Sequence, residues 1–398
     1  MAPSEPSPLL NRDRGLLLAA RGLRAFGFGF SAVLVGLYLE RLGLSPFLIG
    51  VTLGIGLAAS SLTGLGSVAL AARLGRRRTL ALTGLLMTVT GLDLALATQA
   101  PWLVVAGVTG MLGAASVDLG PFAPLEQAAL AEVVEPNRRN LAFGRYSLSG
   151  GLFNAAGGLA AALATLQTGR AFFFLYALIG LMTAGLPLLM SKRVETRVRA
   201  VFGVLSRPET RRVIAGLAAL FALDSFAGGL VANAVISYWL HVRFGAGPQL
   251  LGPVFAGIAL LQAVSYELSG RISVRIGLIN TMVFTHLPSN VLLLFVALSP
   301  SLGWAIALLF ARFLLSQMDV PARQAYVVSV VPQADRAAAV ALTGAARGVA
   351  QAFGPALAGV AIGAAAFGAP FLAGGSLKIV YDLALYAGYR NRHADHET

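Results

Sequence analysis

Charged side chains occur inside long apolar segments of this sequence, at spacings that place them on single helix faces. Arg312, Ser316, Asp319 and Arg323 follow at intervals of four, three and four residues and therefore share one face of a helix. A charge at the centre of a membrane helix costs roughly 2.5–3.5 kcal/mol on insertion scales, so it needs a partner or water. Such side chains can hold a proton, an ion or a charged solute. They can also form static ion pairs that fix helix packing, and the sequence leaves both interpretations open.

The other candidates for such chemistry lie in similar apolar surroundings. Asp224 lies thirteen residues after the basic end of its segment, and Arg21 and Arg24 are three residues apart. Carboxylates that could bind and release a proton are Asp224, Asp319, Asp118 and Glu126. Side chains that could contact a solute in a cavity are Arg21, Arg24, Arg312, Arg323, Gln324, Asn154 and Gln351. Lys378 and Asp382, four residues apart, are expected to neutralise each other. His286 could relay protons, although a lone histidine more often serves in hydrogen-bonded packing.

The elements that carry these side chains are transmembrane helices. Of 398 residues, 57% are hydrophobic and 12% charged, whereas soluble domains hold about 25% charged residues. Lipid must cover much of the surface, and the apolar runs are continuous rather than alternating, which excludes a β-barrel. The sequence predicts an all-α membrane protein of twelve transmembrane helices, near 15–40, 46–72, 79–99, 101–134, 140–166, 170–191, 211–242, 248–274, 278–299, 301–331, 336–365 and 368–389.

Basic residues cluster in alternate connections between these helices. The positive-inside rule therefore places both termini and the central link in the cytoplasm, and this arrangement needs an even number of spans. The expected organisation is a cytoplasmic tail 1–14, a six-helix bundle 15–191, a basic linker 192–210, a second six-helix bundle 211–389 and a cytoplasmic tail 390–398. The net charge of +13 is spread over short loops, so we expect no nucleic acid partner.

The two predicted bundles are internal repeats. Arg73-Leu-Gly75 and Arg275-Ile-Gly277 each follow the second helix of their half, 202 positions apart. Further on, Pro124-Leu-Glu126-Gln127 matches Pro321-Ala-Arg323-Gln324 at an offset of 197 that also relates Gly157 to Gly354. The halves are therefore pseudo-symmetric, with a site expected between them. Glu126 and Arg323 occupy equivalent positions, which makes an ion pair between the halves attractive.

This pattern resembles the major facilitator superfamily over nearly the whole chain. The signature after the second helix of that family reads roughly Gly-x-Leu-x-Asp-Arg-x-Gly-Arg-Arg. Here Val68 and Ala72 replace the glycine and the aspartate, while Arg73, Gly75, Arg76 and Arg77 are kept. The second copy keeps Gly270, Arg275 and Gly277 and also lacks the aspartate. The resemblance implies that these residues form a cytoplasmic gate, that another carboxylate such as Glu267 meets the arginines, and that helices 1, 4, 7 and 10 line a central cavity.

The resemblance also implies secondary active transport by alternating access. We expect proton-coupled efflux of small organic or amphiphilic compounds; a proton-coupled importer of an organic anion is the first alternative. A sensor or assembly protein that transports nothing is the alternative of another class. The sequence holds no nucleotide-binding loop, metal-ligand spacing or catalytic motif, so we expect neither enzymatic activity nor a cofactor or metal. The expected partners are a small-molecule substrate, a proton or other ion and the lipid bilayer, for a monomer in a prokaryotic cytoplasmic (inner) membrane.

Overall fold

The described part of the chain is helical throughout and contains no strand. The computed structural model describes residues 8–114, 120–134, 139–165, 168–195, 208–332 and 335–390. The N-terminal bundle comprises α1 (Pro8–Arg41), α2 (Pro46–Leu74), α3 (Arg76–Leu96), α4 (Ala100–Val108), α5 (Phe122–Val133), α6 (Arg139–Ala161), α7 (Gly169–Gly185) and the short 3₁₀ turns η2 (Leu186–Leu189) and η3 (Lys192–Val194). The C-terminal bundle comprises α8 (Pro208–Leu230), α9 (Asn233–Phe244), α10 (Pro248–Ile276), α11 (Leu278–Ala297), α12 (Leu302–Leu315), α13 (Asp319–Ser329), α14 (Arg336–Gly363) and α15 (Ala369–Tyr389).

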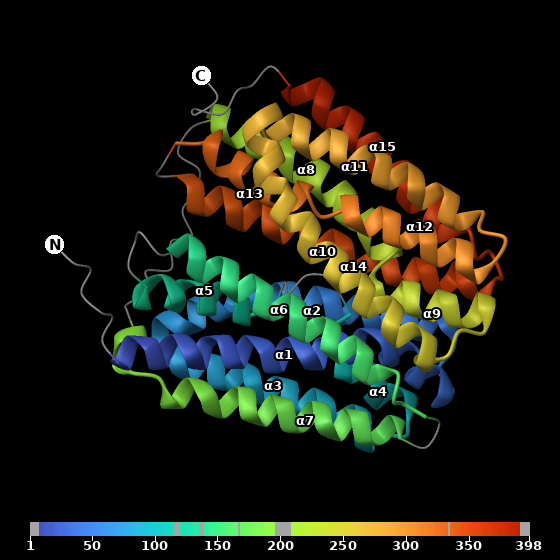
Figure 1. Cartoon of the computed structure of the whole chain (residues 1–398), viewed down its shortest axis with the longest axis horizontal. Helices are drawn as coiled ribbons and strands as arrows, with labels where there is room; N and C mark the ends of the chain where they lie inside the picture. The colour runs from blue at the N-terminus through green and yellow to red at the C-terminus, as the bar shows by residue number, and fades with distance from the viewer. Residues whose placement is uncertain are drawn as a thin grey trace.

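The two bundles lie side by side and splay apart along their length (Figure 1). They meet at the end that holds α4 and α9, which we term the closed end, and diverge toward the end where α1 begins and α15 ends, which we term the open end. Eight segments of the described residues are long and apolar enough to cross a membrane. They include α1, α2, α3, α10 and α11 as single helices.

The predicted repeat is visible in the backbone of the two bundles. Both α2 and α10 are 29 residues long and begin with a proline in their first turn. Each ends at a glycine with positive φ, Gly75 at 87° and Gly277 at 84°. Only glycine adopts this conformation without strain, so the matched glycines turn the chain in the same way in both halves.

Three of the predicted continuous helices are interrupted. The segment 211–242 divides into α8 and α9, 301–331 into α12 and α13, and 101–134 into α4 and α5. In the second case Pro321 explains the break, because proline has no N–H for the carbonyl of Gln317 and its ring collides with that carbonyl. The interruption makes residues 316–318 a turn close to the charged residues of this segment, where Gln317 N–H donates to Ser265 Oγ instead of to its own helix.

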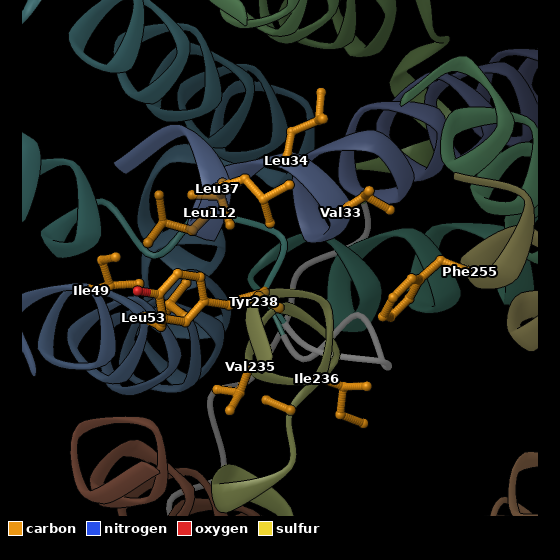
Figure 2. Packing of buried hydrophobic residues seen from close by; sticks show 14 of the residues in the cluster. Val33, Leu34, Leu37, Ile49, Leu53, Leu112, Val235, Ile236, Tyr238 and Phe255 are labelled. Carbon is orange, nitrogen blue, oxygen red and sulfur yellow. The ribbon is translucent and has the colours of Figure 1, made fainter. Parts of the chain in front are cut away.

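Apolar packing seals the closed end. One buried cluster contains Val33, Leu34 and Leu37 of α1 and Val235, Ile236 and Tyr238 of α9, and residues of α2 and α10 complete it (Figure 2). Polar contacts join the same elements: Ser237 Oγ donates to the carbonyl of Val33 at 2.8 Å, and Tyr238 Oη donates to Glu40 at 3.3 Å. The buried clusters of the two bundles near the open end are separate from each other.

Glycines set how far the bundles remain in contact. A Cβ on Gly50 of α2 would lie 2.2 Å from the carbonyl oxygen of Pro355 in α14, and one on Gly54 would lie 2.3 Å from that of Ala352. Further along, Ser61 of α2 still lies against Gly348 of α14, where a Cβ would be 2.2 Å from the serine Oγ. Gly66 lies on the other side of α2, where no atom is within 4 Å of such a Cβ. The helices α2 and α14 thus touch backbone to backbone at Gly50 and Gly54, and Gly66 does not take part in this contact.

These contacts predict the effect of a side chain at the closed end. Gly50→Val should prevent closure, because its side chain would collide with the backbone of Pro355, which cannot yield. The chain holds no cysteine, so a single Ser237→Cys variant reports on this interface through labelling by a membrane-impermeant maleimide. We expect labelling from the closed end to be near background in the Ser237→Cys protein and to rise strongly when Gly50→Val is added. Adding Gly66→Val should change nothing; equal labelling in all three folded proteins would contradict the packing argument.

Candidate functional site

Asp224 of α8 is the centre of a buried ion network in the C-terminal bundle. Its Oδ2 accepts a hydrogen bond from Arg323 of α13 at 3.2 Å, and its Oδ1 accepts one from Lys378 of α15. Arg323 also contacts Asp319, one helical turn earlier, at 2.9 Å. All four residues are at most 6% exposed. Two carboxylates and two cations thus neutralise one another away from solvent.

A second polar group adjoins this network. His286 of α11 contacts Asp382 of α15 through Nδ1 at 2.9 Å, and Asn290 Nδ2 donates to the other oxygen of Asp382 at 2.8 Å. The other ring nitrogen of His286, Nε2, lies 3.9 Å from Asp224 Oδ1. The expected pairing of Lys378 with Asp382 was therefore wrong, because each side chain has a closer partner on another helix. His286 joins the two carboxylates rather than serving in packing alone.

A cavity of about 100 Å³ opens beside these residues, within the C-terminal bundle. Its charged lining consists of the cations Arg312, Arg323, Arg347 and Lys378 and the carboxylates Asp224 and Asp319. His286, Ser225, Ser316, Gln317 and Gln351 add neutral or titratable polar groups. Helices α8 and α11 to α15 all contribute to this lining, so the break between α12 and α13 is part of its wall. The lining carries more positive than negative charge.

Arg312 differs from the other cations of the cavity. Its side chain is buried, yet its Nε has no hydrogen-bond partner in the described part of the chain. The guanidinium lies over the ring of Phe313, 4.8 Å from the centroid, which compensates only part of the hydration that it loses. The hydroxyl of Ser316, one turn further, is likewise buried and without a partner. Buried polar groups are paired in the great majority of cases, so these two mark a place where a ligand can supply the missing contacts.

The N-terminal bundle holds an ion pair of the opposite polarity. Arg24 of α1 binds both oxygens of Glu126 of α5 at 2.7 Å, and Tyr146 of α6 donates to the same carboxylate at 2.6 Å. Asp224 and Arg323 form the corresponding pair in the other half. The expected Glu126–Arg323 pair across the pseudo-two-fold axis is therefore not formed. In each half, an ion pair joins the first transmembrane helix to the fourth. The cation is on the first helix in the N-terminal half and on the fourth helix in the C-terminal half.

The remaining candidates are dispersed. Gln351 lines the cavity, whereas Gln324 is exposed and lies outside it. Asn154 donates to the carbonyl of Ala25 at 3.4 Å, between α6 and α1. Arg21 lies over the ring of Tyr146, 5.2 Å from its centroid. Asp118 falls outside the described residues.

The predicted gate contains a carboxylate that the sequence argument missed. Glu195 accepts hydrogen bonds from the backbone N–H groups of Arg76 at 2.7 Å and Arg77 at 3.2 Å, where α3 begins. An anion is favoured at a helix N-terminus, so Glu195 supplies the charge that the absent aspartate would provide. The expected partner, Glu267, instead contacts Arg271 of its own helix at 3.3 Å, and both are exposed. An isolated acid within the basic linker was the available signal for Glu195.

The other residues of the gate motif make few contacts. Arg73, Gly270 and Arg275 are exposed, and Gly75 lies against Glu195, where a Cβ would approach the carboxylate to 2.3 Å. Arg76 also donates to the carbonyl of Val194 at 3.2 Å. In the N-terminal half, the gate segment is thus attached to the start of the linker.

The architecture, two helical bundles related by a repeat, agrees with a match to a known family. The sequence model of the Major Facilitator Superfamily matches residues 17–316. The chain belongs to this superfamily. It is therefore an integral membrane protein of a family of transporters.

Known relatives resemble the chain along nearly its full length. The uncharacterized membrane protein YJR124C of Saccharomyces cerevisiae is 23% identical over 420 residues, which cover 94% of this chain and 93% of the yeast protein. Among solved structures, the nucleoside transporter NupG gives a TM-score of 0.75 at 13% identity, covering 94% of this chain and 99% of NupG. A bacterial homolog of the human lysosomal transporter Spinster, inward-facing and unoccupied, gives 0.69 at 15% identity, covering 96% and 95%. At these identities the structural likeness concerns the fold.

The contrast between the two buried arginines predicts opposite effects on stability. Arg24→Met should destabilise the protein by about 3–5 kcal/mol, because it leaves Glu126 buried without its cation. Arg312→Met should leave the melting temperature unchanged or raise it, because it removes a buried charge that has no ion-pair partner. Thermal unfolding of the purified proteins in detergent measures both. An equal loss of stability in the two variants would mean that Arg312 has a structural partner of its own.

Proposed function

We propose that this protein is a proton-coupled secondary transporter that moves a small polar solute by alternating access. The observation that carries the proposal is the combination of a closed end, an open end and a buried charged cavity between them. Backbone contacts at glycines hold the bundles together at one end only, so a rocking motion could exchange the closed and open ends. Discontinuous helices beside the cavity are typical of solute and ion sites in secondary transporters.

The loop arginines support a cytoplasmic position for the open end. On this proposal the structure represents the state that faces the cytoplasm, and both termini lie on that side. A prokaryotic cytoplasmic membrane is our proposed location, and the likeness to a yeast protein makes a eukaryotic membrane the alternative.

The cavity lining bears on the class of solute. A cationic amphiphile, of the kind carried by efflux proteins, would meet four cationic side chains and two carboxylates that are already paired. A solute with a negative or strongly polar group would gain from the same charges. The lining therefore favours the anion alternative over efflux of cationic compounds, while the direction of transport depends on the coupling.

The pair formed by His286 and Asp382 is best suited to carry the coupled proton. Asp224 and Asp319 contact Arg323 or Lys378, and Glu126 contacts Arg24, so permanent cations already neutralise them. Within the described part of the chain, Asp382 is bound by His286 and Asn290 and by no permanent cation. A histidine becomes charged only by taking up a proton near neutral pH. Protonation of His286 would neutralise Asp382 and add positive charge beside Asp224 and the cavity.

Flux measurements in proteoliposomes test this proposal. A screen of organic anions and cationic dyes should find a solute that the protein accumulates under an imposed pH gradient. His286→Gln or Asp382→Asn should abolish the dependence of this flux on the gradient. Both variants should still exchange the solute at equal pH. The matched control is His241→Gln. The half-buried His241 lies at the closed end, away from the cavity, where its Nε2 is 3.3 Å from a carboxylate oxygen of Glu40. If both cavity variants kept full gradient-driven flux, this proton site would be wrong.

A protein of another class would give a different outcome. A sensor or assembly protein should bind its ligand without moving it, so the complete absence of flux for every solute that stabilises the purified protein would overturn the transport proposal.

A further inference from the structure

Two buried donors without partners lie one helical turn apart on the cavity wall. Arg312 and Ser316 are each 5% exposed and line the same cavity. The Nε of Arg312 and the Oγ of Ser316 have no hydrogen-bond partner among the described residues. Ser316 follows the last residue of α12, where the ladder is interrupted before Pro321, so its hydroxyl is available to a group in the cavity.

A second pair of donors reaches the cavity from α14. Arg347 and Gln351 are also one turn apart and line the cavity. Arg347 donates through Nε to Ser225 Oγ at 3.1 Å. Its terminal nitrogens make no hydrogen bond or ion pair within the described part of the chain. Like Arg312, it is a guanidinium whose forked end has no acceptor.

The carboxylates of the cavity form no ion pair with these two arginines among the described residues. Asp224 is within ion-pair distance of Arg323 and Lys378, and Asp319 is within that distance of Arg323. Neither carboxylate lies within 4.0 Å of a nitrogen of Arg312 or Arg347 in the described structure. Two guanidinium groups without an ion pair therefore line one small space, and an anion bound there would supply the missing contacts and offset part of the desolvation cost.

We infer that Arg312 and Arg347, together with Ser316 and Gln351, form the binding site for an oxoanion group, carboxylate or phosphate, of the transported solute. The guanidinium fork matches both groups through paired N–H···O contacts, and a hydroxyl and an amide complete the donor set. The N-terminal bundle offers no such site at Arg24, because Glu126 already binds that guanidinium at both oxygens. That the bound anion is transported rests on the proposed transport function; that it binds at this site does not.

Equilibrium binding to the purified full-length protein tests the site. Acetate, succinate and inorganic phosphate should each be compared with uncharged acetamide at constant ionic strength, with the rise in melting temperature as the measure of affinity. We expect one or more of the anions to stabilise the protein in a concentration-dependent way and acetamide to have no effect. The ranking of acetate and succinate against phosphate decides between a carboxylate and a phosphate group.

Variants show whether the guanidinium groups hold the anion. Arg312→Gln and Arg347→Gln should each weaken the affinity about tenfold or more, as expected for loss of a charge-assisted hydrogen bond. Arg312→Lys, which keeps the charge but not the fork, should fall between Arg312→Gln and the unchanged protein. The control is Arg271→Gln, because Arg271 is 75% exposed on the surface of α10 and should leave the affinity unaltered.

Two results would overturn the anion site. One is stabilisation by acetamide equal to that by acetate; the other is unchanged anion affinity in both Arg312→Gln and Arg347→Gln. The outcome is separable from that of the transport proposal. Anion binding without any flux would keep the site and refute transport, whereas gradient-driven flux of a neutral solute by a protein that binds no anion would keep transport and refute the site.

Discussion

The cost of burying charge in an apolar bundle determines how this structure is arranged. An isolated ion removed from water costs several kcal/mol even after the protein relaxes, so each intramembrane charge must find a partner, a proton or a ligand. In the N-terminal bundle, Glu126 has a partner, because its carboxylate is bound by Arg24 and Tyr146. In the C-terminal bundle the same requirement is met for Asp224 and left unmet for Arg312. The difference is that the buried ion pair of the N-terminal bundle is closed on itself, whereas the pair of the C-terminal bundle adjoins a cavity with a cation that is unpaired in the described structure.

The repeat makes this difference informative. The first and fourth helices of each half contribute one ion pair, yet the acid is on the fourth helix in one half and on the first in the other. A gene duplication explains why the two ion pairs occupy equivalent positions. Because acid and base are exchanged together, each pair remains neutral. The C-terminal half adds Arg312, Arg347, Lys378 and His286 around its copy of the pair. Function is therefore expected to be concentrated in one half, although the fold is shared equally between two.

Much of the fold could be predicted from the sequence, because hydropathy and repeats report directly on helices. The glycines at 75 and 277 marked the turn that each half repeats. The interruption before Pro321 was not predicted, because hydropathy continues across it as in one helix. The pairing of side chains could not be read in the same way. Spacing along one helix joined Lys378 to Asp382, yet the structure gives these residues partners on α8 and α11. Spacing describes one helix face, whereas the partner of a buried charge depends on how several helices pack.

The position of the closed end connects the glycines to the charges. Close approach of α2 to α14 requires positions without a side chain, and Gly229 and Gly354 let α14, which carries Arg347 and Gln351, approach α8 in the same way. A rocking motion that separated Gly50 from Pro355 would also move the helix that carries half of the inferred donor set. An anion bound between Arg312 on α12 and Arg347 on α14 would then join two helices, so its presence would favour some positions of α14 over others. A ligand shifts a conformational equilibrium only by its differential affinity for the two states, and a site divided between two helices can provide that difference.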